Sequence, residues 1–208
     1  MPEPLTRGCA LAGAAIGCYG KIPARGDFIR QGLPRGFVEA WDAWFGGMLT
    51  ASRARLGEDW LDAWLEAPVW HFVLAAGVCG ADAAIGLWMP SVDRVGRHFP
   101  LVLAAVVPDA EPGELILGGG GFLAAAAAAG LAAVTADAPP EALCARLVEA
   151  ARQPPGAAPV DPALCPRSGA LWWTEGAPRV RPGSFASPSL PQAAAFAAML
   201  DQRVTAAA

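Results

Sequence analysis

The sequence predicts an α/β fold, a layered sandwich of helices packed on a mixed sheet of about five or more strands. One observation is a long apolar stripe with helical spacing that begins at Phe37. The other is a set of short, β-rich apolar runs, joined by brief connections early in the chain and by helical segments later. The length of 208 residues suits one domain over 1–208, with 1–12 loosely ordered and 153–169 forming a Pro-rich loop.

Each predicted strand is a short apolar run that ends near a proline, a glycine or a charged residue. The run from Leu101 to Val107 stops at Pro108 and has the composition of a buried strand. The sequence VWHFVLA, at residues 69–75, is rich in β-formers and alternates in polarity. We predict strands at 14–19, 69–75, 84–89, 101–107 and 170–174.

The clearest predicted helix lies between Pro34 and Gly57, residue types that often flank helices. Its aromatic stripe is compatible with a ligand pocket, but core packing is the favoured interpretation. The stripe consists of Phe37, Trp41, Trp44, Phe45, Met48 and Leu49. Further helices are predicted at 60–65, at 121–134 with the glycines 118–121 as a flexible entry, after Pro140, and at 191–203.

The composition argues against several function classes. The formal net charge is −4, and Lys21 is the only lysine, with no basic run, so nucleic-acid binding has no electrostatic support. No strongly apolar run of about 18 or more residues is evident, so membrane insertion is not expected. The five cysteines form no C-x-x-C pair, and neither histidine lies near a pair of thiols, which favours a reducing compartment and no metal. The short apolar run before Cys18 favours a buried strand over a signal peptide, so we expect a cytoplasmic protein. We also expect no cofactor.

The most charged segment between two apolar runs extends from residue 90 to residue 100. It contains Ser91, Asp93 and His98, which are the residue types of a hydrolase triad. Three such residues on one loop rarely reach triad geometry, and no G-x-S-x-G elbow exposes the serine. We therefore favour a structural or binding role, in which Asp93 pairs with an arginine such as Arg25, Arg94 or Arg97.

A second charged loop follows the first predicted strand. Gly20 and Lys21 do not form a phosphate-binding loop, because the first glycine and the Ser/Thr of that motif are missing. If the two loops meet, they form one polar cluster. The candidate site residues are Lys21, Arg25, Asp27, Ser91, Asp93, Arg94, Arg97 and His98, with no catalytic residue assigned.

Several motifs give the chain a resemblance to the TagF family. Residues 20–28 (GKIPARGDF) resemble the family's G-K-x-P-x-x-G-D-F opening, and residues 90–101 (PSVDRVGRHFPL) resemble its P-S-V-D-R-V-G-R-x-F-P-L segment. Residues 68–74 (PVWHFVL) and 171–174 (LWWT) match further family segments, so the resemblance runs from about residue 17 to 203. It implies a three-layer α/β/α domain and a cytoplasmic, post-translational repressor of type VI secretion that binds the forkhead-associated scaffold of the apparatus.

Two further functions stay open at the level of sequence. One is a hydrolase-like enzyme that uses Ser91, Asp93 and His98, and the other is a regulatory domain that binds a small ligand. The resemblance brings no catalytic residues, cofactor or metal, and so favours a non-enzymatic binding protein. The sequence does not specify an oligomeric state.

Overall fold

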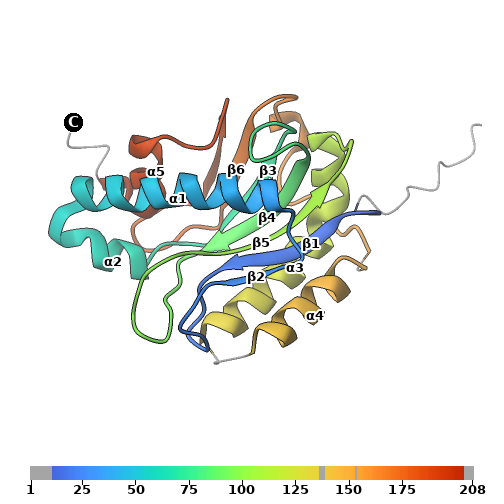
Figure 1. Ribbon diagram of the computed structural model, residues 1–208. Helices are drawn as coiled ribbons and strands as arrows, with labels where there is room; N and C mark the ends of the chain where they lie inside the picture. The colour runs from blue at the N-terminus through green and yellow to red at the C-terminus, as the bar shows by residue number, and fades with distance from the viewer. Residues whose placement is uncertain (1–10, 136–138, 153, 204–208) are drawn as a thin grey trace, which may run out of the picture.

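The computed structural model describes residues 11–135, 139–152 and 154–203 (Figure 1). Most of the segment predicted to be loosely ordered, 1–12, therefore lies outside the described residues. Seven strands form one sheet in the order β2-β1-β5-β4-β3-β6-β7. The strands are β1 (Ala15–Gly20), β2 (Ile29–Gln31), β3 (Trp70–Leu74), β4 (Ala83–Met89), β5 (Leu101–Val107), β6 (Ala170–Thr174) and β7 (Gly183–Ser187).

The α/β class is confirmed, but the predicted mixed sheet is wrong because every neighbouring pair of strands is antiparallel. A single crossover helix would have returned the chain for a parallel strand. The connection from β5 to β6 instead contains two helices, α3 (Pro112–Thr135) and α4 (Pro140–Ala150), which pack together. Two helices bring the chain back to the end of the sheet where β5 finished, so β6 runs opposite to β5.

Helices lie on both faces of the sheet (Figure 1). The face covered by α3 and α4 carries one apolar cluster, and the opposite face carries a second, largely aromatic one. Alternation along β4 explains the division, because Leu87 belongs to the first cluster and its neighbour Trp88 to the second. The aromatic face is covered by α1 (Arg35–Leu56), α2 (Trp60–Leu65) and α5 (Ala193–Leu200); short 3₁₀ turns lie at Gly57–Asp59 and Pro162–Leu164.

The aromatic stripe of α1 packs into the core, as the favoured interpretation predicts. Phe37, Trp41 and Phe45 are buried, and the ring of Trp41 lies 5.1 Å from that of Phe72 on β3. The stripe is therefore used to attach α1 to the sheet.

The four glycines at 118–121 lie inside α3 and not at its entry, which corrects the expectation from sequence. The helix begins earlier, at Pro112. A Cβ on Gly119 would come within 2.3 Å of Ile85 Cδ1, and a Cβ on Gly120 within 2.1 Å of the Ala157 carbonyl oxygen. The glycines thus allow the sheet and the following loop to approach the helix closely.

Gly120→Ala should therefore destabilise the fold by about 1–3 kcal/mol, because the new methyl group meets backbone that has little room to move. Gly113→Ala is the matched control in the same helix, since a Cβ there meets nothing within 4 Å. Alanine is the better helix former, so this control should be neutral or up to about 1 kcal/mol more stable. Urea unfolding of both variants measures the difference. Equal stabilities would contradict the close approach.

Because α3 starts early, it is also longer and more apolar than predicted. It is the one helix among the described residues that is long and apolar enough, by length and composition, to cross a membrane, with 44% of its apolar window buried. The expectation that no segment reaches this composition is therefore wrong. In the structure, Leu115, Phe122 and Ala126 pack in the cluster between α3 and the sheet.

Candidate functional site

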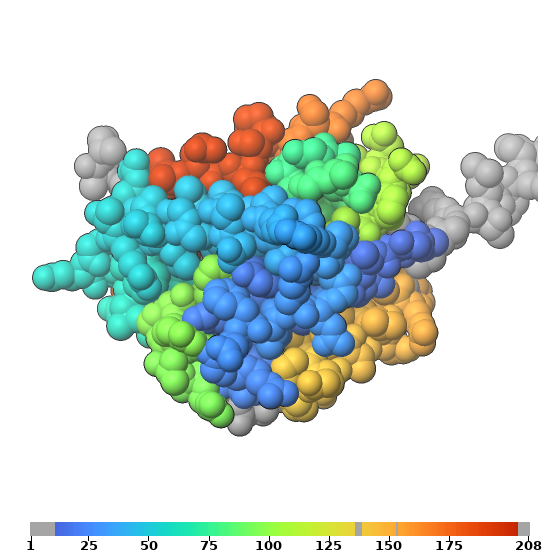
Figure 2. All heavy atoms as spheres, viewed as in Figure 1, coloured from blue at the N-terminus to red at the C-terminus, as the bar shows by residue number. Residues whose placement is uncertain are grey.

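The two charged loops leave the same end of neighbouring strands. Gly20 ends β1 opposite Leu101, which begins β5, in an antiparallel pair. The loop after β1 and the loop before β5 must therefore start side by side. Figure 2 shows the two segments, in blue and light green, together on one face of the molecule with α4 beside them.

Asp93 is the buried centre of this loop pair, with a side chain that is 0% exposed. Its Oδ2 accepts hydrogen bonds from Lys21 Nζ at 2.8 Å and from Arg97 Nε at 2.6 Å. Its Oδ1 accepts from the backbone N–H groups of Val95 and Arg97 at 3.0 and 2.9 Å. The Asp93 carboxylate thus accepts hydrogen bonds within its own turn and also links that turn to Lys21 in the loop after β1.

These contacts also set the protonation state of Asp93. Burial acts to raise the pKa of the carboxyl group, but the hydrogen bonds from Lys21, Arg97 and Val95 outweigh it and hold the pKa well below its usual range. Asp93 is therefore an ionised structural acceptor and is poorly suited to take up a proton as a general base.

Further contacts join the two loops through backbone atoms. The N–H of Arg94 donates to the Arg25 carbonyl oxygen at 3.0 Å, and the Arg97 guanidinium donates to the Gly26 carbonyl oxygen. Arg25 thus reaches the cluster by its backbone and not by the side-chain pairing considered from sequence. Asp27 is exposed, and none of its contacts reaches Asp93.

Ser91 and His98 do not assemble with Asp93 into a triad. Ser91 Oγ is buried and has no hydrogen-bond partner among the described residues. The His98 ring packs edge-on against Trp60, with centroids 5.4 Å apart. Desolvation and, secondarily, the charge of Arg53 lower its pKa. In the described part of the chain, no hydrogen bond joins Ser91, Asp93 and His98, and no group of His, Cys, Asp and Glu is placed to hold a metal ion.

Comparison with known proteins extends over both loops. A family model described as TagF N-terminal domain, type VI secretion system-associated, matches residues 17–150. The chain belongs to the TagF family. The crystal structure of PA0076 from Pseudomonas aeruginosa PAO1 is similar, with a TM-score of 0.79 and 35% identity over 90% of this chain and 94% of that one. No curated protein matches in sequence. Family membership supports a regulatory role in type VI secretion.

In this TagF chain the loop pair includes an aromatic residue that the sequence analysis did not select. Phe28 is 46% exposed, and its ring stacks on Tyr19 with centroids 5.5 Å apart. Lys21 Nζ lies 5.0 Å from the same ring, in a cation–π contact. The Tyr19 hydroxyl donates to Asp42 of α1 at 2.5 Å. The signal that could have found Phe28 is its place in the GDF motif, directly after Asp27.

A surface pocket of about 490 Å³ lies where the two loops meet α4. We call it the arginine pocket. Its charged and aromatic lining consists of Arg25, Asp27, Phe28, Arg30, Arg94 and Glu141. Several residues of the two family motifs that do not pair with Asp93 therefore line this pocket.

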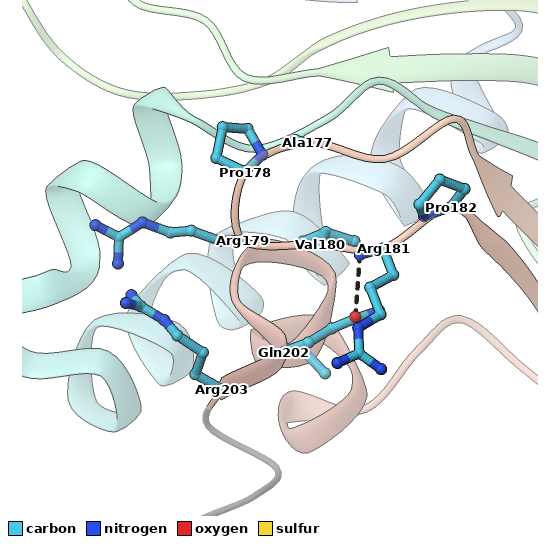
Figure 3. Close-up of a pocket in the computed structure, with 9 residues that line it drawn as sticks. Ala177, Pro178, Arg179, Val180, Arg181, Pro182, Gln202 and Arg203 are labelled. Atoms are coloured by element: carbon cyan, nitrogen blue, oxygen red, sulfur yellow. Dashed lines mark hydrogen bonds between the residues drawn. The ribbon is translucent and has the colours of Figure 1, made fainter.

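A larger pocket, about 770 Å³, lies at the C-terminal side of the chain (Figure 3). Two of its three arginines are already paired, because Arg179 and Arg203 both contact the buried carboxylate of Asp201, at 3.0 and 2.5 Å, whereas the Arg181 side chain is exposed. Arg179 also pairs with Glu66, next to α2. This network attaches the C-terminal segment to the domain, so the loop pair is the better candidate for a functional surface despite the smaller volume there.

Proposed function

We propose that the protein is a non-enzymatic, cytoplasmic, post-translational repressor of type VI secretion that acts by binding the forkhead-associated scaffold protein of the apparatus. The observation that carries the proposal is the use of Asp93. The residue that could have served a catalytic triad is ionised, buried and fully engaged in holding the two loops.

The loop pair has the properties of a prepared binding surface. Its support is the buried pair of Lys21 and Asp93, to which the exposed Arg97 is bonded. Arg25, Arg94 and Phe28 are exposed beyond this support. A surface that is fixed before the partner arrives loses less conformational freedom on binding. Family membership supplies the secretion system in which such a surface would act.

The structure also changes which variant best tests the proposal. Arg97 would be an obvious choice for charge reversal, but its guanidinium bonds to Asp93 and to the Gly26 carbonyl group. Arg97→Glu would therefore disturb the support as well as the surface. Arg94→Glu changes only an exposed side chain.

Ser91→Ala and His98→Ala should leave repression of secretion intact, because neither side chain bonds to Asp93 in the described structure. Each variant is tested in cells that lack the wild-type gene, by measuring secreted apparatus components, with thermal unfolding as the check on folding. Loss of repression by a folded Ser91→Ala variant would support the hydrolase and contradict the proposal.

A further inference from the structure

The arginine pocket differs in charge from the protein as a whole. The chain carries a net charge of −4. The pocket is lined by three arginines, Arg25, Arg30 and Arg94, against two carboxylates, Asp27 and Glu141, so its local balance is positive. A positive pocket on an acidic protein attracts negative groups to one place and not to the surface in general.

The positive side chains of the pocket are available for a partner. Arg30 and Arg94 make no side-chain hydrogen bond or ion pair within residues 11–135, 139–152 and 154–203. Arg25 has one contact, with Glu141 at 3.5 Å, between side chains that are 54% and 70% exposed. Such an exposed pair is weak and can be exchanged for another carboxylate. The arginines in Figure 3 differ, because Asp201 already pairs with two of them.

The backbone beneath these side chains is fixed. Arg94 follows the buried Asp93, and its own N–H bonds to the Arg25 carbonyl oxygen, so the two arginines have a set separation. The Phe28 ring stacks on Tyr19 and packs edge-on against Phe99, with 4.8 Å between the Phe28 and Phe99 centroids. The pocket therefore offers guanidinium groups around a firmly seated, half-exposed ring.

The first turn of α4 completes the rim. Pro140 and Glu141 line the pocket, and they are the first residues of an 11-residue helix. The aligned peptide dipoles give the beginning of a helix a partial positive charge. Here Pro140 has no N–H group, and the N–H groups of Ala142 and Leu143 bond to the Pro139 carbonyl oxygen. The attraction for an acidic ligand therefore comes from the arginines, and the helix start only borders the pocket.

We infer that the arginine pocket binds an acidic peptide segment of the protein partner. Carboxylates of the segment pair with Arg25, Arg30 and Arg94, and an apolar side chain beside them packs on Phe28. Arginine suits this task because its planar guanidinium accepts a carboxylate in two parallel hydrogen bonds. The inference rests on the proposed function, since it specifies the chemistry of the partner at the same surface.

A short acidic peptide tests the pocket without the scaffold. We would titrate an octaglutamate peptide into the isotope-labelled full chain and follow the backbone amide signals. The expected result is a set of shifts at residues 24–31, 94–97 and 141–142 that vanish in Arg94→Glu and weaken as salt is added. The inference is overturned if these signals do not move, or if the shifts fall around Arg179 and Arg203 instead.

The scaffold then tests the same surface in its proposed context. Arg94→Glu should weaken scaffold binding about tenfold or more, and Arg94→Lys should keep part of the affinity. Arg167→Glu is the control, because Arg167 is an exposed arginine in another depression, beside Glu111 and Glu114. Equal losses in Arg94→Glu and Arg167→Glu, or none in either, would reject the pocket. If wild type does not bind the scaffold at all, the proposed function fails, and the peptide titration still decides whether the pocket takes acidic segments.

Discussion

Replacing Asp93 by alanine should lower the melting temperature by on the order of 10 °C, one of the largest effects expected for a polar residue in this protein. The carboxylate accepts four hydrogen bonds, and its removal leaves the Lys21 ammonium buried without its partner, since that side chain is only 7% exposed. An uncompensated buried charge costs far more than a lost surface ion pair. Thermal unfolding followed by circular dichroism measures the effect.

Asp27→Ala is the matched control for this prediction. It removes the other aspartate of the loop pair, which is exposed and makes no bond to Lys21, Asp93 or Arg97. We expect its melting temperature to lie within a few degrees of wild type, about 2 °C. If Asp93→Ala is as stable as Asp27→Ala, Asp93 does not hold the loops together.

The low pKa of Asp93 also predicts how stability depends on pH. A carboxyl group whose pKa is lower in the folded than in the unfolded state contributes stability above its unfolded pKa, about 3.9 for aspartate. That contribution is lost as the pH falls through the lower, folded-state value. The stability advantage of wild type over Asp93→Asn should thus be constant near neutral pH and shrink below about pH 4. An advantage that is unchanged down to pH 2 would contradict this role.

Trp41→Ala should cost about 3–5 kcal/mol of unfolding free energy, because it removes the centre of the aromatic cluster. Trp41 is fully buried, and its ring lies 5.6 Å from Phe37, 5.4 Å from Phe45 and 5.1 Å from Phe72. No nearby side chain can fill the resulting cavity without breaking its own packing. Urea unfolding gives the loss directly.

Two variants separate packing from other causes. Trp41→Phe should cost less than Trp41→Ala, because it keeps an aromatic ring and removes an indole N–H that has no hydrogen-bond partner in the described structure. Gly47→Ala alters the same helix where a Cβ meets nothing within 4 Å, and should be neutral or slightly stabilising. A small effect of Trp41→Ala would show that the stripe does not anchor α1 to the sheet.

The strands predicted correctly are those whose residues are mostly buried. The runs at 84–89 and 101–107 are β4 and β5, which are buried at every position. The sequence analysis missed β2 and β7, the two edge strands of the sheet. Both are short and partly exposed, and they lie among glycines and prolines, so neither apolar pattern nor composition marks them. The predicted mixed sheet was wrong because hydrophobic periodicity identifies strands but does not determine whether neighbouring strands run parallel or antiparallel.

In the candidate site, too, some contacts could be predicted from the sequence and others could not. Arg97 was correctly considered as a partner of Asp93, because both lie in one loop. Lys21 was selected as a candidate but not paired with Asp93, since that contact depends on β1 lying beside β5, which the sequence does not reveal. Phe28 was missed because an isolated phenylalanine in a turn-rich segment resembles a core residue until its exposure is known.

The most direct test of the proposed function is a binding measurement between two purified proteins. The chain is titrated with the forkhead-associated scaffold of the same secretion gene cluster, in the absence of other components. We predict direct binding by wild type and by Ser91→Ala, with a clear loss in the folded Arg94→Glu variant. Absence of binding by folded wild type would contradict the proposal that repression works through the scaffold.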